Sequence, residues 1–271
     1  MKKIIGLLLA MILQGSVMAQ LEQVVRYEQP KEDEDDFFTT ISCGAFGLLI
    51  VEEDHVKGKA ETWIMTGLDT TLTQMWELRL AIDYRYDFKA YDVLDENVYI
   101  VFQQADRIVA DYRVVKIDLV RGTMVAFEVS NEIAFEMTNI MVIQDRIILG
   151  GYVRYSPTLL SYTVGDSRFQ VVPGLFKDKS DIIDLRPNGS DTYNILTRES
   201  SYTGPFMRIR TYSYDSEMLF ERVIEMDRNY EVLDGTSIGF VEGNIAVVGT
   251  YGARNSKYVQ GLYYVLVRPE G

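Results

Sequence analysis

The chain has 271 residues, of which 47% are apolar and 25% are charged, and its formal net charge is −13. These fractions are those of an ordinary globular protein, and they exclude a disordered chain, a collagen and a protein that crosses a membrane many times. The acidic balance argues against a nucleic-acid partner and against docking on anionic lipid, because both need clustered basic charge.

Residues 1–19 have the pattern of a secretory signal peptide. Two lysines precede the apolar run Ile4–Leu13, and Val17 and Ala19 are the small residues before an expected cut after Ala19. The apolar run is too short to span a bilayer. We therefore expect a bacterial protein that is periplasmic or secreted, with no membrane span.

Residues 20–36 are expected to hold a short strand and an acidic linker ahead of a domain that covers residues 37–271. The strand is predicted at Leu21–Gln29, and the linker is the acidic run Lys31–Asp36. A calcium loop needs oxygen ligands spaced around a turn that a glycine bends, and this run has neither feature. No metal is expected there.

Cysteine and histidine are too scarce for most metal and catalytic chemistry. Cys43 is the single cysteine, so no intrachain disulfide forms, and its strand-like surroundings predict a buried thiol. His55 is the single histidine and follows Glu52, Glu53 and Asp54, which predicts a solvated loop residue. No catalytic residue, metal site or cofactor is expected.

Beyond residue 37 the dominant hydrophobic period is two, which is typical of strands. Between Trp76 and Phe88, apolar and polar residues alternate, and no long amphipathic helix stands out. Five apolar cores recur, with first residues 46 to 52 positions apart. The cores are Leu48–Val51, Tyr99–Phe102, Ile147–Leu149, Tyr193–Leu196 and Ile245–Val248. The last four each follow a second apolar stretch and a polar turn.

A period near 50 residues with three or four strands per unit is the signature of propeller blades. The sequence therefore predicts an all-β protein, a β-propeller of about five blades. The propeller is either incomplete or closed by the N-terminal strand Leu21–Gln29, which would then supply the outer strand of the short last unit. A β-sandwich is the remaining alternative.

Two turns carry a resemblance to a known family. Lys116–Gly122, an apolar strand followed by Asp and Gly, resembles the outer-strand turn of quinoprotein-type bacterial propellers, and so does Gly67–Leu72 followed by Trp76. The resemblance implies a secreted bacterial β-propeller-like repeat protein. It implies no cofactor, because the vicinal cysteines often found in quinoproteins are absent.

Candidate ligand-binding residues lie in two similar loops, one after the third apolar core and one after the fifth. Loops on a rigid scaffold are where binding residues gather, and Arg and Tyr are the types that anchor interfaces. The candidates are Tyr152, Arg154 and Tyr155 in the first loop and Tyr251, Arg254, Asn255 and Lys257 in the second.

The scarcity of catalytic residue types predicts a non-catalytic binding scaffold for an envelope or extracellular protein or glycan. The alternative is a carbohydrate-active enzyme, a glycosidase or lyase, with an Asp/Glu pair in the central channel. Two pairs come into question, Asp83 with Asp87 and Asp181 with Asp184. A third possibility is a structural surface protein.

Overall fold

A computed structural model gives the fold of the chain, and almost every residue that it describes is in a strand or a turn. It describes residues 26–28, 37–54, 61–105, 109–174, 180–201, 204–227, 229–239 and 244–268. Within these ranges the helical structure is a single 3-10 turn, Gly44–Phe46. The predicted acidic linker at 31–36 and His55 lie outside the described residues.

The strands form five antiparallel sheets that follow one another in chain order. The first sheet contains β1 (Phe38–Ser42), β2 (Leu48–Asp54), β3 (Glu61–Leu68) and β4 (Gln74–Ile82), and the second contains β5 (Tyr86–Leu94), β6 (Asn97–Gln104), β7 (Tyr112–Asp118) and β8 (Thr123–Val129). The third contains β9 (Glu136–Ile143), β10 (Arg146–Val153), β11 (Ser156–Thr163) and β12 (Gln170–Val171). The fourth contains β13 (Asp181–Pro187), β14 (Thr192–Ser201), β15 (Gly204–Ser213) and β16 (Met218–Ile224). The last contains β17 (Tyr230–Gly239), β18 (Ile245–Ala253) and β19 (Val259–Val267).

The repeat read from the sequence is confirmed strand by strand. Each of the five apolar cores is the second strand of its sheet, namely β2, β6, β10, β14 and β18. A second strand pairs on both edges, and in the three inner sheets it is also covered on both faces, so it carries a run of apolar residues instead of an alternating pattern. Val98 to Phe102 in β6, for example, are all buried.

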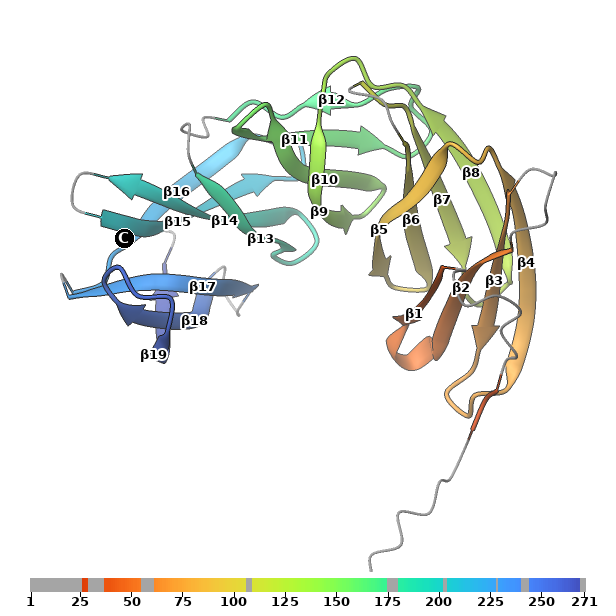
Figure 1. Cartoon of the computed structure of the whole chain (residues 1–271), viewed down its shortest axis with the longest axis horizontal. Helices are drawn as coiled ribbons and strands as arrows, with labels where there is room; N and C mark the ends of the chain where they lie inside the picture. The colour runs from red at the N-terminus through yellow and green to blue at the C-terminus, as the bar shows by residue number, and fades with distance from the viewer. Residues whose placement is uncertain are drawn as a thin grey trace, which may run out of the picture.

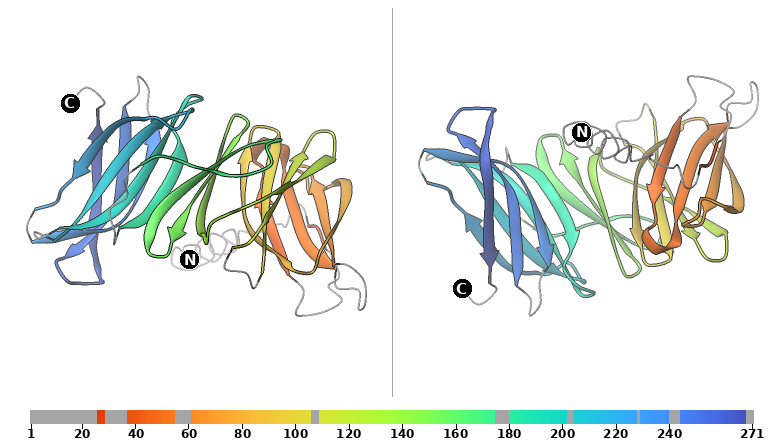
Figure 2. Two further views of the ribbon diagram at one scale, coloured as in Figure 1. Left: turned by 90° about the horizontal axis from the view of Figure 1, so that it is seen from above. Right: turned by 90° about the horizontal axis from the view of Figure 1, so that it is seen from below.

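The five sheets lie side by side along an arc, with the first strand of each sheet toward the concave side (Figure 1). The first and last sheets are the two ends of this arc, and an opening separates them, as the two further views also show (Figure 2). The architecture is therefore all-β and propeller-like, and the described part of the chain does not close it into a ring.

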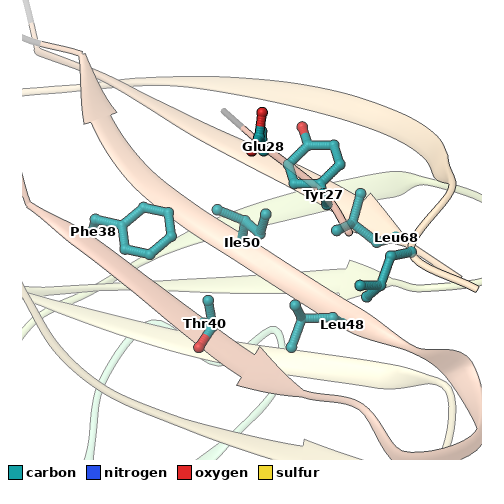
Figure 3. A pocket seen from close by; sticks show the side chains of 8 residues that line it. Tyr27, Glu28, Phe38, Thr40, Leu48, Ile50 and Leu68 are labelled. Carbon is teal, nitrogen blue, oxygen red and sulfur yellow. The ribbon is translucent and has the colours of Figure 1, made fainter. Parts of the chain in front are cut away.

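The predicted closure by the N-terminal strand is not what the described residues show. Of Leu21–Gln29 the structure describes Arg26–Glu28, and these residues are not in a strand. Tyr27 and Glu28 lie over the first sheet, beside Phe38 and Ile50 (Figure 3). The last sheet keeps three strands.

Four apolar clusters join the five sheets pairwise. The first cluster lies between the first two sheets, where the rings of Trp63 and Phe102 meet edge to face with centroids 4.9 Å apart. The other three fill the junctions from the second sheet to the last. Burial between neighbouring sheets is thus the main stabilising contribution to the arc, and each of the three inner sheets is covered on both faces.

The two turns that resemble those of quinoprotein-type propellers meet at the first junction. The indole N–H of Trp76 donates a hydrogen bond to the Leu119 carbonyl at 2.9 Å. A Cβ on Gly67 or Gly122 would come within 2.3 and 2.5 Å of the Trp76 ring. Both glycines are therefore needed for the close approach of this ring, and Gly122 also has a φ of +58°, which favours glycine.

Two carboxylates, the half-buried Asp92 and the buried Asp184, join the first strands of neighbouring sheets. The N–H of Val142 in β9 donates to Asp92 in β5 at 2.6 Å. Asp184 in β13 accepts the N–H of Ser237 in β17 at 2.8 Å and the Thr236 hydroxyl at 2.9 Å. Burial raises the pKa of Asp92, although the N–H groups of Val142 and Val93 oppose the shift. These bonds supplement the apolar packing along the concave side.

Cys43 is a free thiol in the core of the first junction, as the sequence predicts. The residue is 3% exposed, and burial raises the pKa of its thiol to about 11. Among the described residues, no helix has the length and apolar character to cross a membrane.

Candidate functional site

The predicted ligand-binding residues lie in two corresponding hairpins, β10–β11 and β18–β19. Arg154, Arg254, Asn255 and Lys257 are exposed, and Tyr155 is 88% exposed. Arg154 and Asn255 have φ values of +60° and +62°, so each occupies the left-handed position of its turn.

The other two predicted residues have structural contacts. The Tyr152 hydroxyl accepts the N–H of Ile182 at 3.0 Å and so links the third sheet to the fourth. The Tyr251 ring packs edge-on against Tyr230 with centroids 5.2 Å apart. Both side chains are half-buried, and their contacts stabilise the fold.

The structure does not join these two hairpins into one site. One belongs to the third sheet and the other to the last sheet, and the fourth sheet lies between them along the arc (Figure 1). Both hairpins connect the second and third strands of a sheet, so they lie at the same end of the strands. Binding by these residues, and the envelope or extracellular partner expected for them, stay predictions.

The carboxylate pairs proposed for a glycosidase are held in ion pairs. Arg85 donates to both oxygens of Asp83, at 2.9 and 2.7 Å, and these bonds lower the pKa of Asp83 to about 2. Asp87 pairs with Lys89 at 3.2 Å. A general acid needs a raised pKa, so this pair lacks the property that glycosidase chemistry requires.

The second carboxylate pair is also structural. Asp181 pairs with Arg198 at 2.7 Å, and Asp184 pairs with Arg186 at 3.1 Å and holds the last sheet. Across the described ranges, no group of three or more acidic, histidine or cysteine side chains has the geometry for a metal ion.

The fourth sheet contains a buried ion network that the sequence analysis missed. Glu199 is 1% exposed and accepts hydrogen bonds from Arg210 at 2.7 Å and Arg208 at 3.1 Å. Burial by itself raises the pKa of Glu199, but the bonds and charges of the two arginines outweigh it, and the pKa is lowered. Arg208 and Arg210 also reach Glu221 on β16, at 3.0 and 3.4 Å. The network joins three strands of one sheet.

The most unusual surface is the free face of the last sheet. One face packs on the fourth sheet through Val232, Val247 and Tyr263. The other face exposes large apolar side chains: Ile238 is 50% exposed, Leu262 76%, Tyr264 60% and Leu266 40%. β18 and β19 contain no charged residue. We call this surface, made of Ile238, Val248, Leu262, Tyr264 and Leu266, the last-sheet face.

Three of the other four outer strands are protected by charge, and the fourth, β12, has only two residues. β4 carries Glu77 and Arg79, β8 carries Glu128, and β16 carries Glu221 and Arg222. Charged residues on an edge strand prevent unwanted pairing with other chains. β19 has nine residues, pairs with β18 alone and has no such protection. This absence of charge from Val259 to Val267 was the sequence signal that could have located the surface.

Part of the free face of the first sheet is also apolar, and Tyr27 and Glu28 lie over that part. It holds a hollow of about 750 Å³ lined by Phe38, Leu48, Ile50, Leu68 and Leu72 together with Tyr27, Glu28 and Thr40 (Figure 3). Leu68 and Ile50 are buried, whereas Phe38 is 51% exposed. We call this surface the first-sheet face.

Comparison with known proteins gives fold-level likeness only. No family model matches the chain, and no curated protein matches it. A lignostilbene dioxygenase of Pseudomonas brassicacearum is similar in structure, with 10% identity and a TM-score of 0.49 over 86% of this chain and 60% of that one. A variant of the Synechocystis apocarotenoid oxygenase has 7% identity and a TM-score of 0.45 over 80% and 58% of the two chains. A subtype N10 neuraminidase-like protein from a little yellow-shouldered bat isolate has 8% identity and a TM-score of 0.42 over 81% and 74%.

This chain thus spans about 60% of the length of the first two structures. The expectation of a non-catalytic binding scaffold is contradicted by this set of neighbours, because the first two are oxygenases by name. The physical reason is that an arc of sheets holds catalytic sites as readily as binding sites, so the architecture does not indicate an inert scaffold. At 7 to 10% identity the likeness concerns the fold alone and assigns this chain no activity.

Proposed function

We propose that this chain is a structural module, an arc of β-sheets that is completed when further β-sheet packs on the last-sheet face. One observation carries the proposal, the uncharged and exposed surface of β18 and β19 at an open end of the arc. An exposed apolar patch on a soluble protein marks an interaction site or an aggregation hazard.

The fold itself defines what fits on this face. All four junctions of the arc consist of one sheet packed on the next through apolar side chains. The last-sheet face continues that series, because it is the side of the last sheet turned away from the fourth. An apolar sheet face is therefore the surface that matches it in shape and chemistry.

An apolar fluorescent dye tests whether the last-sheet face is available. A dilute solution of the purified protein is titrated with anilinonaphthalene sulfonate, and Leu262→Lys is compared with Val125→Lys. Val125 is 55% exposed on β8, so the control makes the same charge change on another exposed apolar position. We expect Leu262→Lys to lower the dye signal and Val125→Lys to leave it close to that of the wild type. Equal signals from all three proteins would overturn the proposal.

We also propose that the module acts outside the cytoplasm. The support is the signal-like pattern of residues 1–19. Expression in a Gram-negative host followed by mass determination of the purified chain tests this. A mass that lacks residues 1–19 is expected, and a chain that keeps them would contradict export by this route.

A further inference from the structure

The last-sheet face and the first-sheet face, which Tyr27 and Glu28 partly cover, are complementary halves of the same kind of junction. Along the arc, the forward side of each sheet packs on the backward side of the next sheet. Among the described residues, no further sheet packs on the last-sheet face, which is a forward side, or on the first-sheet face, which is a backward side (Figure 1). The junction that the fold repeats would therefore join a last sheet to a first sheet.

We propose that the partner of the last-sheet face is the first-sheet face of a second copy of this chain, packed head to tail. This inference rests on the proposed function and names the partner of that site. An interface of this type uses two different patches, so each copy keeps one patch for the next copy.

The strand directions place the exposed apolar residues of the two faces opposite each other. Strands β2 and β18 are both second strands, so they run in the same direction in their sheets. Leu262 pairs with Thr250 near the end of β18, and Phe38 pairs with Glu52 near the end of β2. If the copies stack as the sheets of the arc do, Leu262 of one copy faces the neighbourhood of Phe38 in the other.

The charges at this end of the strands are complementary. The β18–β19 hairpin carries the exposed cation Lys257, whereas the guanidinium of Arg254 lies close to Gly204 of the fourth sheet. β2 ends in Glu52, Glu53 and Asp54 at the corresponding end of the first sheet. Opposite charges at the rim of an apolar interface set its orientation and favour the right partner. Lys257 is also among the residues that the sequence indicates as ligand-binding.

The hollow on the first-sheet face gives large side chains a place to enter. It is lined by the apolar residues Phe38, Leu48, Ile50, Leu68 and Leu72 together with Tyr27, Glu28 and Thr40, and Ile50 and Leu68 are its buried members (Figure 3). Leu262, Tyr264 and Leu266 project from alternate positions of β19, which is the spacing of side chains on one face of a strand. Aromatic and aliphatic anchors that fill a pocket dominate the affinity of most interfaces.

Sedimentation velocity over a range of concentrations tests the head-to-tail arrangement. The proteins are the purified full chain, Leu262→Lys, Phe38→Lys and the control Val125→Lys. All three substitutions add one positive charge at an exposed position. We expect the wild type and Val125→Lys to associate, and Leu262→Lys and Phe38→Lys to associate at least about tenfold more weakly.

Mixing the two defective variants gives the decisive result. In an equimolar mixture, the intact last-sheet face of Phe38→Lys meets the intact first-sheet face of Leu262→Lys. Pairs should form with the affinity of the wild type, and growth should stop at two chains because the other two faces carry lysine. No recovery in the mixture, or association of Leu262→Lys equal to that of the wild type, would overturn the head-to-tail partner.

The outcomes separate this inference from the proposed function. If the wild type remains monomeric at every concentration while the dye still distinguishes Leu262→Lys from Val125→Lys, the last-sheet face is available but its partner is not a second copy. If the dye does not distinguish the variants, the proposed function fails as well.

Discussion

The fourth and last sheets are neighbours in the arc, yet their outermost strands differ in charge. In the fourth sheet, β16 places Glu221 against Arg208 and Arg210, and the charges continue inward to the buried Glu199. In the last sheet, the outermost strand is the third one, β19, and it contains only uncharged residues. A sheet whose outer strand is held in ion pairs needs no further surface to cover that strand. A sheet with an apolar outer strand needs a further surface to cover it, and this difference locates the docking face.

The largest expected effect is on the charged network of the fourth sheet. Glu199→Gln leaves Arg210, itself 3% exposed, without its buried counter-charge. Removing one partner of a buried ion pair costs about 3–5 kcal/mol of unfolding free energy. Urea denaturation monitored by circular dichroism measures the loss. The matched control Glu221→Gln removes a half-exposed partner and should cost about 1 kcal/mol or less. Equal losses would show that burial of this pair is unimportant.

The pH dependence of this network has a defined sign. Because the pKa of Glu199 is lowered in the folded state, its charge stabilises the fold fully above the unfolded pKa, about 4.3. That contribution is lost as the pH falls through the folded pKa. The difference in unfolding free energy between wild type and Glu199→Gln should therefore shrink below about pH 4. A difference that stays constant between pH 7 and pH 3 would contradict the assignment.

The next test concerns the hydrogen bonds by which Asp184 joins the fourth sheet to the last sheet. Asp184→Ala removes the acceptor for the Ser237 N–H and the Thr236 hydroxyl. Hydrogen bonds to a charged group contribute about 1.5–3 kcal/mol, so a loss of that order is expected. Hydrogen exchange should show the last sheet losing protection before the fourth. Asp181→Ala, which breaks an exposed ion pair with Arg198, is the control and should change little.

At the junction between the first two sheets, there is no room for an additional side-chain atom beside Trp76. Gly122→Ala puts a Cβ 2.5 Å from the Trp76 ring at a residue with φ +58°. We expect a loss of about 1–3 kcal/mol from overpacking. Thermal unfolding measures it, and Gly165→Ala separates the two causes, because Gly165 has φ +103° with open space around it. If the two variants lose the same stability, backbone strain alone explains the effect.

The smallest effect is expected on the free face itself. Leu262→Ala removes a side chain that is 76% exposed, so the unfolding free energy of the monomer should change by about 0.5 kcal/mol or less. Ile209→Ala, on the face of the fourth sheet that packs on the last sheet, should cost about 2–5 kcal/mol. Denaturation of dilute protein compares the two. A large loss from Leu262→Ala would mean that the last-sheet face is already covered.

The five-sheet repeat could be predicted because it depends on local patterns. Runs such as Tyr99–Phe102 are apolar at every position of a strand that is covered on both faces, and turns separate them at a nearly constant spacing. The buried thiol of Cys43 was predictable for the same reason. The hairpins with Arg154 and Arg254 were also located, but the sequence could not show that the fourth sheet lies between them.

The ion network, the role of Asp184 and the open arc could not be predicted, because they depend on which strands lie side by side. Glu199 meets Arg208 and Arg210 only in the register in which Thr197 lies opposite Arg208. Asp184 reads as one half of a catalytic pair until β17 is placed beside β13, where it accepts the Ser237 N–H. Likewise, closure by Leu21–Gln29 is plausible from composition, and only the position of Tyr27 over the first sheet argues against it.

The central claim is that the last-sheet face becomes covered by another sheet, and a tryptophan at position 264 reports this directly. Tyr264 is 60% exposed, so Tyr264→Trp should fold normally, and its emission is obtained by subtracting that of the wild type. The account predicts emission that acrylamide quenches readily in dilute protein, and that shifts to shorter wavelength and resists quenching as the protein is concentrated. Emission that remains equally quenched at every concentration would contradict coverage of this face by a second copy.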